Sequence, residues 1–341
     1  MVGSGDDGRE GWYLVPRRIL FLGGTGVISA ACVRRAVERG HEVTVLNRGS
    51  TSRRELPERV EVLRADLRDA AAVDAALGDR RFDAVAQFLA FTPDQVEADI
   101  ERFVGRTRQY VFVSSASAYQ KPPASVPVTE STPLKNPFWQ YSRDKIACED
   151  RLLHAYREID FPMTVVRPSH TYDDTTLPTL GGWTDIARMR AGRPVVVHGD
   201  GTTQWTLTHS DDFAVGFVGL LGRPEAIGNA YTITGDSAPT WNQVYQWLAR
   251  AAGVEEPRLV HVASETIAAA LPELGPGLVG DKAHSMVFDT SKLRALAPEF
   301  ATTIPYSLGA ERAISWYDAH PEAQQVDRDL DARFDRLIER A

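Results

Sequence analysis

Three side chains that together could handle the proton of an alcohol occur within a short stretch of this chain. Tyr141 and Lys145 stand four positions apart, so in a helix they share one face. Ser115 lies upstream, just after a predicted buried strand. A phenol with a pKa of about 10 is a weak base at neutral pH, but a neighbouring ammonium lowers that pKa. We therefore predict that Tyr141 exchanges the proton of a substrate hydroxyl while Ser115 orients its oxygen.

A glycine turn near the start of the chain indicates a nucleotide site. Gly23, Gly24, Thr25 and Gly26 follow an apolar strand and lead directly into a helical pattern. A dinucleotide's pyrophosphate needs backbone N–H groups at a helix N-terminus and glycines that permit a tight turn. The turn therefore predicts NAD(P) binding. The residues expected to contact the cofactor here are Gly23, Thr25, Gly26, Val27 and Ile28.

The residues after the second predicted strand bear on the choice between NAD and NADP. An acidic residue there would bind the ribose 2′-hydroxyl and repel a 2′-phosphate, but the chain has Asn47 and Arg48, with Arg53 and Arg54 close behind. This pattern favours NADP over NAD. The alternative is that Arg48 lies over the adenine ring or points to water, while Asn47 binds ribose hydroxyls.

The elements that must position these residues alternate between short apolar runs and longer amphipathic ones. This order is typical of an α/β fold, a doubly wound parallel sheet with helices on both faces. The predicted strands are 19–22, 42–46, 60–63, 82–88, 109–113 and 163–166. The predicted helices are 27–39, 69–77, 93–104 and 141–157.

The regular alternation fades after Pro168, and this change predicts the domain organisation. We expect a leader at 1–16, a cofactor domain at 17–168 and a smaller substrate-binding region at 169–341, with segments near 206–235 returning to the first domain. A strand at 231–234 and a helix at 241–252 are predicted in the second region. The charged stretch 326–341 is predicted to be an exposed helix whose charges face solvent.

Composition limits the classes of partner. The chain has 341 residues, 43% of them hydrophobic, and a formal net charge of −8, which disfavours binding to nucleic acid or to anionic membranes. No apolar run reaches the length of a membrane span. The only cysteines, Cys32 and Cys148, fit a reducing, cytoplasmic location. A small-molecule substrate is therefore expected, and the composition leaves a homodimer open.

Several motifs in sequence order resemble the extended short-chain dehydrogenase/reductase family, the NAD-dependent epimerase/dehydratase group. They are LGGTGVIS at 22–29, ADL at 65–67, VFVSSASAY at 111–119, YSRDK at 141–145, VVRPSHTY at 165–172 and TLTHSDDFA at 206–214. The resemblance implies a Rossmann domain followed by a substrate domain. It assigns the catalytic roles to Ser115, Tyr141 and Lys145, with Lys145 also holding the nicotinamide ribose. It further implies cofactor contacts from Asp66, Leu67, Phe88, Leu89, Ala90, Pro168, Ser169 and His170.

Two departures from the family pattern concern the substrate. Nucleotide-sugar dehydratases of this family resemble one another in an Asp-Glu pair, where this chain has Ala116, Ser117 and Ala118. A hexose 4,6-dehydratase is therefore not expected. Trp205 stands where members that bind nucleotide diphosphates carry an arginine. An indole replaces a cation with a stacking surface and one N–H donor, which favours a less charged substrate such as a sugar, nucleoside or polyol.

An alternative for Trp205 and the roles of other polar residues stay open at this point. Trp205 could pack in the core while Arg188 or Arg193 binds a phosphate. His170 could be a second acid or base or a structural residue, and Lys121 a proton donor or a solvated loop residue. The candidate substrate contacts are Ser117, Lys121, Tyr172, Trp183 and Trp205, with Trp139 also near the cleft. His209, Asp211 and Asp212 lack a third partner at suitable spacing, so no metal is expected.

The function predicted from these patterns is oxidation of a secondary alcohol of a sugar, nucleoside or related polyol with NAD(P). A transient ketone would acidify the neighbouring C–H, so epimerisation, dehydration or simple redox could follow. The alternatives are an NADPH-dependent ketoreductase and a non-catalytic protein on the same fold. The latter would be a cofactor sensor or an RNA-associated protein, because LGGTGVIS and NRG also resemble chloroplast stem-loop-binding relatives.

Overall fold

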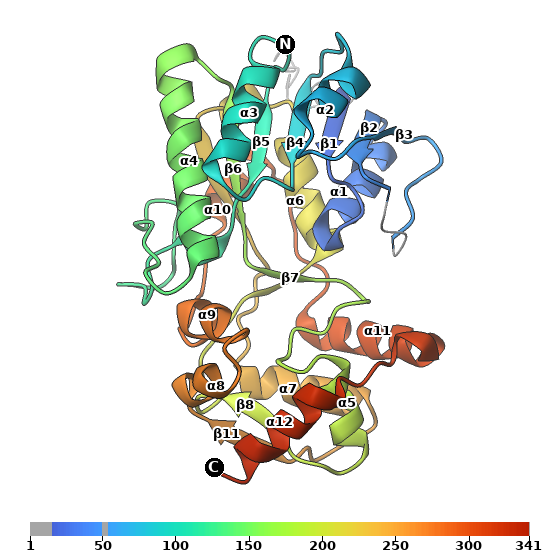
Figure 1. The fold of residues 1–341 in the computed structure, drawn as a ribbon, viewed down its shortest axis with the longest axis vertical. Coiled ribbons are helices and arrows are strands. Elements are labelled where there is room, and N and C mark those ends of the chain that lie inside the picture. The colour runs from blue at the N-terminus through green and yellow to red at the C-terminus, as the bar shows by residue number, and fades with distance from the viewer. Residues whose placement is uncertain (1–15, 50–53, 341) are drawn as a thin grey trace, which may run out of the picture.

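A seven-stranded sheet, parallel throughout, forms the upper half of the protein in this computed structural model, which describes residues 16–49 and 54–340 (Figure 1). The strand order is β10-β6-β5-β4-β1-β2-β3, so the order reverses next to β1. Ligands bind beyond the carboxyl ends of strands at such a reversal. The strands are β1 (Arg18–Leu22), β2 (Glu42–Asn47), β3 (Glu61–Arg64), β4 (Ala84–Gln87), β5 (Tyr110–Val113), β6 (Met163–Pro168) and β10 (Asn229–Ile233).

Helices cover both faces of this sheet. One apolar layer joins Phe21 and Val45 to Phe213 and Phe217, and a second joins Leu20 and Leu22 to residues of the helices on the other face. The strands predicted at 19–22, 42–46, 60–63, 82–88, 109–113, 163–166 and 231–234 all have counterparts with shifted ends. The helices are α1 (Val27–Glu38), α2 (Ala70–Leu77), α3 (Pro93–Phe103), α4 (Gln140–Ile159), α6 (Ser210–Leu220) and α10 (Ser291–Leu296).

The lower half of the molecule is helical and contains two short strands (Figure 1). β8 (Val195–His198) and β11 (Leu259–Val262) pair in parallel, and β7 (His170–Tyr172) pairs with β9 (Leu207–His209) near the junction of the halves. The helices of this half are α5 (Trp183–Arg190), α7 (Trp241–Ala251), α8 (Ser264–Ala270), α9 (Gly275–Gly277), α11 (Tyr306–Ala319) and α12 (Arg328–Ile338). A π-helix, η4 (Leu278–Lys282), follows α9 directly.

The chain crosses between the halves more than once. After β7 it enters the lower half, and it returns through α6 and β10, whose Tyr231 pairs with Val166 of β6. The leader expected at 1–16 falls, except for Pro16, outside the described residues. Among the described residues, no helix combines the length and apolar character that a membrane span requires.

The predicted exposed C-terminal helix was only partly right. α12 buries Phe334 and Leu337, and its Asp331 and Asp335 form ion pairs with Arg188 of α5. The side chain of Arg188 is only 1% exposed. A buried guanidinium needs a carboxylate partner, so part of this charge run serves packing instead of facing solvent.

Candidate active site

The glycine turn opens a cleft at the carboxyl edge of the large sheet. The N–H of Gly23 donates to the carbonyl of Leu46 at 3.0 Å, and Gly23 has a φ of +88°, a left-handed conformation that favours glycine. A Cβ at Gly23 would lie 2.9 Å from Cγ of Leu89. The Oγ of Ser29 accepts from the N–H of Gly26 at 2.9 Å. The hydroxyl of Ser29 therefore caps the turn, a role that its small size alone did not predict.

This cofactor cleft has a volume of about 1000 Å³ and extends from the glycine turn to Tyr141 and Lys145. Its size suits a dinucleotide, and the basic residues Arg48 and Arg68 are among those that line it. Of the residues predicted to bind cofactor, Val27 and His170 do not line it. Those that do are Gly23, Thr25, Gly26, Ile28, Asn47, Arg48, Asp66, Leu67, Phe88, Leu89, Ala90, Lys145, Pro168 and Ser169.

The basic residues near the adenosine end of this cleft have different environments. The side chain of Arg48 is 60% exposed and lies 3.9 Å from the carboxylate of Asp66. Arg54, by contrast, donates to Asp173 at 2.6 Å and to Thr175 at 2.8 Å. Arg53 lies outside the described residues. The NADP prediction rested on Arg48, Arg53 and Arg54. Of the two that the structure describes, Arg48 has the exposed side chain and Arg54 is mostly buried.

A buried polar network that sequence reasoning missed holds the wall of the cleft after β4. The Oε1 of Gln87 accepts from the N–H groups of Leu89 at 2.6 Å and Ala90 at 3.1 Å. Its amide donates to Asp99, which also accepts from the hydroxyl of Tyr110 at 2.7 Å. Burial raises the pKa of Asp99 against these hydrogen bonds. A glutamine ending a buried strand was the available sequence signal, because a buried amide needs partners.

Ser115, Tyr141 and Lys145 lie together in the wall of this cleft. Ser115 precedes a short 3₁₀ helix, η2 (Ala116–Ala118), while Tyr141 and Lys145 occupy the first turns of α4. The Oγ atoms of Ser115 and Ser117 are 2.9 Å apart, and Ser142 donates to Ser117 at 2.8 Å. Ser117 is buried and does not line the cofactor cleft, so its contacts fix the orientation of Ser115.

Lys145 is buried, with its ammonium held by two backbone carbonyls. Its Nζ donates to Ala90 at 2.7 Å and to Val113 at 2.8 Å. Burial lowers the pKa of Lys145 to about 8. The same Nζ lies 4.6 Å from the ring centre of Phe91 and 5.8 Å from that of Tyr141. These contacts hold the ammonium of Lys145 between the cleft wall and the ring of Tyr141.

The pKa of Tyr141 differs from the sequence expectation. Burial raises it, hydrogen bonding with Ser115 acts in the opposite direction, and the charge of Asp281 raises it further. Lys145 does not reverse this shift, and its ammonium lies 5.8 Å from the ring centre of Tyr141. In the protein without ligands Tyr141 is therefore a neutral phenol, suited to donate a proton.

The structure also corrects the predicted substrate contacts. Tyr172 is fully buried, lies 5.0 Å from Tyr306 ring to ring, and belongs to the core of the lower half. Trp183 stacks on Tyr317 at 4.8 Å in the same core. Trp139, in contrast, lies beside Tyr141, with ring centres 4.8 Å apart. Sequence proximity misplaced the first two, because β7 and α5 direct these rings into the lower half.

Neither arginine suggested as a phosphate ligand is available for that role. Arg188 donates to Asp335 at 2.8 Å and to the carbonyl of Pro194 at 2.7 Å. Arg193 donates to Asp331 at 2.9 Å and to Asp335 at 2.8 Å. Trp205 is 1% exposed, so it packs in the core as the alternative held. The second half of that alternative is wrong, because both cations are neutralised by α12.

The remaining ambiguous residues acquire definite surroundings. Burial and the charge of Lys282 lower the pKa of His170 to about 3, so its ring is neutral at physiological pH. Lys121 is buried and forms an ion pair with Asp281. It is therefore not a solvated loop residue, which was one of the two alternatives for it. The ring of His209 lies 3.1 Å from Asp174, a contact that the sequence did not suggest.

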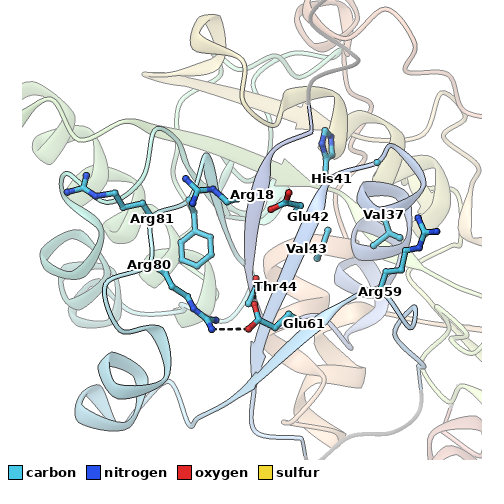
Figure 2. Close-up of a pocket in the computed structure, with 12 residues that line it drawn as sticks. Arg18, Val37, His41, Glu42, Val43, Thr44, Arg59, Glu61, Arg80 and Arg81 are labelled. Atoms are coloured by element: carbon cyan, nitrogen blue, oxygen red, sulfur yellow. Dashed lines mark hydrogen bonds and ion pairs between the residues drawn. The ribbon is translucent and has the colours of Figure 1, made fainter.

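A second cavity lies at the opposite, amino edge of the sheet (Figure 2). It has a volume of about 560 Å³, and an ion pair of 2.9 Å between Arg80 and Glu61 crosses part of its lining. Arg18 and Glu42, which begin β1 and β2, contribute to its wall. Ser115, Tyr141 and Lys145 lie at the other edge, so this cavity is separate from the cleft that they line.

Comparison with known proteins agrees with this geometry. The model of the NAD dependent epimerase/dehydratase family matches residues 19–234, more than half of the chain. The chain therefore belongs to this family, whose members are NAD(P)-dependent enzymes of the extended short-chain dehydrogenase/reductase class.

The names of individual relatives describe different functions. The chain is 28% identical to the 2'-dehydrokanamycin reductase of Streptomyces kanamyceticus, covering 83% of this chain and 80% of that protein. It is also 28% identical to the chloroplast stem-loop binding protein of 41 kDa b of Arabidopsis thaliana, covering 72% of this chain and 66% of that protein. A solved dTDP-glucose 4,6-dehydratase from Streptomyces venezuelae has the same fold, with a TM-score of 0.71, 20% identity and coverage of 89% and 98%.

Proposed function

We propose that this protein catalyses reversible oxidation of a secondary alcohol on a sugar-type substrate, with Ser115, Tyr141 and Lys145 as its catalytic residues. The observation that carries the proposal is that all three side chains line the same cleft as the glycine turn. A cofactor held along that turn would therefore place its reactive end beside a proton donor. The division at residue 168 into cofactor-binding and substrate-binding regions is part of the proposal.

The residues of the chain divide the proton chemistry between them. The neutral phenol of Tyr141 donates its proton to a ketone oxygen in the reduction direction, and the phenolate of Tyr141 accepts the proton of the alcohol in the oxidation direction. Ser115, oriented by Ser117, donates a hydrogen bond to the same oxygen. Lys145 supplies a positive charge that favours the phenolate formed after proton donation. The nicotinamide of a bound cofactor supplies or accepts the hydride.

Two observations support simple redox chemistry over elimination. Ala116 and Ala118 flank Ser117 where the family's dehydratases carry acidic residues, so no carboxylate follows the active serine. A relative that covers 83% of this chain, the 2'-dehydrokanamycin reductase of Streptomyces kanamyceticus, is named a reductase. Epimerisation stays the alternative within the family, since it requires the same three residues and a ketone that rotates in the site.

We infer NADP as the preferred cofactor and a cytoplasmic location. The exposed guanidinium of Arg48 supports the first, since a 2′-phosphate at the adenosine end of the cleft could bind it. The two buried free cysteines support the second. Affinities for NADPH and NADH, measured by cofactor fluorescence in the wild type and Arg48→Met, test the preference. A variant that loses NADPH affinity about tenfold while keeping NADH affinity is the expected result.

The activity itself is tested by absorbance at 340 nm. Purified protein with NADP⁺ or NAD⁺ is offered methyl glycosides, kanamycin, UDP-glucose and UDP-galactose. Cofactor reduction that disappears in Tyr141→Phe supports the proposal. If the cofactors bind but no substrate in a broader alcohol and ketone panel changes the absorbance, a cofactor-sensing role replaces the enzymatic one.

A further inference from the structure

A buried ion pair lies behind the cofactor cleft, between α4 and β6. The Nη2 of Arg167 is 2.5 Å from Oε2 of Glu149, and the Nε of Arg167 donates to Oε1 at 3.1 Å. Their side chains are only 7% and 6% exposed, and neither lines the cleft. α4 and β6 lie side by side in the upper half of the molecule (Figure 1). The pair therefore joins the helix to the strand away from solvent.

Glu149 shares a side of α4 with two of the proposed catalytic residues. Tyr141, Lys145 and Glu149 follow one another at intervals of four positions in this helix. Residues with this spacing are neighbours on the surface of a helix. The helix is continuous from Gln140 to Ile159, so a contact that fixes Glu149 also fixes the phenol and the ammonium one and two turns earlier.

The same ion pair holds both ends of the segment that carries Ser115. The Oγ of Ser114, the residue directly before it, donates to Oε1 of Glu149. At the other end, after η2, the hydroxyl of Tyr119 accepts from Nη1 of Arg167 at 3.1 Å. The carboxylate thus contacts the residue before the serine, and the guanidinium contacts the residue after η2. Together they set where this segment lies relative to α4.

Stability alone does not account for a buried pair of this kind. Removing two charges from water costs free energy that their attraction often fails to return, and apolar residues of similar volume can replace such a pair without loss of stability. What the charges provide here is direction. The Nε and Nη2 of Arg167 bind Glu149 while its Nη1 binds Tyr119, and the N–H groups of a guanidinium point in fixed directions.

The charge of Glu149 also acts on Lys145. Burial lowers the pKa of Lys145 to about 8, and Cys148 and Glu149 act in the opposite direction. The ammonium also lies 5.8 Å from the ring centre of Tyr141. Burial raises the pKa of Cys148 to about 12 and raises that of Tyr141, so both are uncharged at physiological pH. Among these neighbours, Glu149 is the carboxylate that favours the charged form of the lysine.

We propose that Glu149 and Arg167 are positioning residues that fix Ser115 relative to Tyr141 and Lys145. Through this pair, the hydrogen-bond donor and the proton donor converge on one substrate oxygen. The proposal rests on the proposed function, because the three residues that it positions are the proposed catalytic ones. The pair itself contacts neither substrate nor cofactor, since neither side chain lines the cleft.

A double variant tests the pair without leaving a buried charge unpaired. Glu149→Leu with Arg167→Met removes both charges, which often leaves stability unchanged. The matched control is Arg188→Met, because Arg188 is also buried and ion-paired but lies in the lower half, away from the cleft. Ser114→Ala removes one contact of the carboxylate and keeps both charges. The Tm of each variant shows that it is folded.

The first measurement is the Kd for NADPH against pH, read by fluorescence titration. In the wild type its rise follows the loss of the proton of Lys145 near pH 8. In the double variant we expect the midpoint at a lower pH, because the ammonium has lost the carboxylate that favours its charge. Ser114→Ala and Arg188→Met should keep the wild-type midpoint, since Glu149 stays charged in both.

The second measurement is the NMR signal of Tyr141 in protein whose tyrosines carry ¹³C at Cζ. Its resonance is identified as the one missing from Tyr141→Phe. We expect it to shift in the double variant and, by less, in Ser114→Ala, because the hydrogen bonding between Tyr141 and Ser115 changes when the serine segment moves. Arg188→Met should leave this resonance in place. Neither this measurement nor the titration needs a substrate.

Turnover gives a third readout with any substrate that the wild type oxidises. In the double variant kcat should fall about 10- to 100-fold, the usual cost of a displacement of about 1 Å, while KM stays within about threefold. An unchanged Tyr141 resonance in the folded double variant overturns the proposal, as does an equal shift in Arg188→Met. If the double variant does not fold, an unchanged resonance in Ser114→Ala overturns it.

The failure of the proposed function has a different signature. A wild type that binds NADPH but turns over no alcohol or ketone contradicts the enzymatic role. The titration and the Tyr141 resonance still decide whether Glu149 and Arg167 position the three side chains. An unchanged midpoint in the double variant overturns the action of Glu149 on Lys145.

Discussion

Arg54 donates its Nε hydrogen to the carboxylate of Asp173 at 2.6 Å and thereby joins the cofactor cleft to the chain just beyond β7. Both side chains are mostly buried, 15% and 13% exposed. Burial alone would raise the pKa of Asp173, but hydrogen bonds from Arg54, Thr176 and Thr175 lower it. The charged pair is therefore a firm contact across the rim of the cleft.

Loss of this contact is expected to weaken cofactor binding. In Arg54→Met, Asp173 keeps its hydrogen bonds to Thr175 and Thr176 but loses its cationic partner. We expect a fall of about 1 to 3 kcal/mol in the free energy of unfolding and a several-fold higher Kd for NADPH. Chemical denaturation and fluorescence titration measure the two effects. Arg190→Met is the control, because its ion pair with Asp318 is more exposed and distant from the cleft. Equal effects in both variants would contradict the assignment.

Tyr141→Phe removes the proposed proton donor and leaves the ring. We expect kcat to fall about 10² to 10⁴-fold, since this is the usual contribution of a positioned acid or base. NADPH affinity should stay within about twofold of wild type, because the phenyl ring keeps its packing against Trp139. Tyr156→Phe on the outer part of α4 is the matched control and should keep full activity. Turnover within a few-fold of wild type in Tyr141→Phe would falsify the mechanism.

The charge on Lys145 predicts a pH dependence of cofactor binding. Its pKa of about 8 means that the ammonium is present below that pH and is lost above it. We expect the Kd for NADPH to be constant at pH values well below 8 and to rise as the pH increases through about 8. Fluorescence titrations across this range measure the change. In Lys145→Met the Kd should be higher at low pH and independent of pH, and a rise that persists there would assign the titration to another group.

The same group predicts the sign of a stability change. In the unfolded chain a lysine stays protonated to a pH of about 10.4, whereas folded Lys145 loses its proton near pH 8. Between these values the unfolded state binds more protons, so Lys145 makes folding more favourable as the pH rises. Denaturation of wild type and Lys145→Met at several pH values isolates this contribution as their difference. The free energy of unfolding of the wild type minus that of Lys145→Met should increase as the pH rises above about 8. A decrease of this quantity would contradict the burial of the ammonium.

Neutralising the partners of Arg188 should destabilise the lower half. In the double variant Asp331→Asn with Asp335→Asn, a guanidinium that is 1% exposed loses both carboxylates. We expect a loss of about 3 kcal/mol, the lower end for breaking a buried pair, because the carboxylates are partly exposed. Thermal and chemical denaturation measure it. Asp329→Asn on the exposed face of α12 is the control and should change stability by less than about 0.5 kcal/mol.

Local patterns were sufficient to predict much of the fold and the presence of Ser115, Tyr141 and Lys145 in one cleft. The glycine turn, the alternation of strands and helices and the Tyr141–Lys145 spacing are short-range features, and their period and composition determine local structure. Seven predicted strands have counterparts in the large sheet for this reason. The placement of Ser115 at a carboxyl strand end followed from the same reasoning.

Contacts between distant segments decided what local patterns could not. Whether Lys121 is solvated depends on Asp281, and whether Arg188 is available for a phosphate depends on α12. The pKa of Tyr141 depends on burial and on a carboxylate 140 residues away in sequence (281 minus 141). The sequence by itself determined which residue types enter the cleft and in what local geometry. Only the tertiary structure decided which charges are desolvated and which are paired, because both depend on long-range packing.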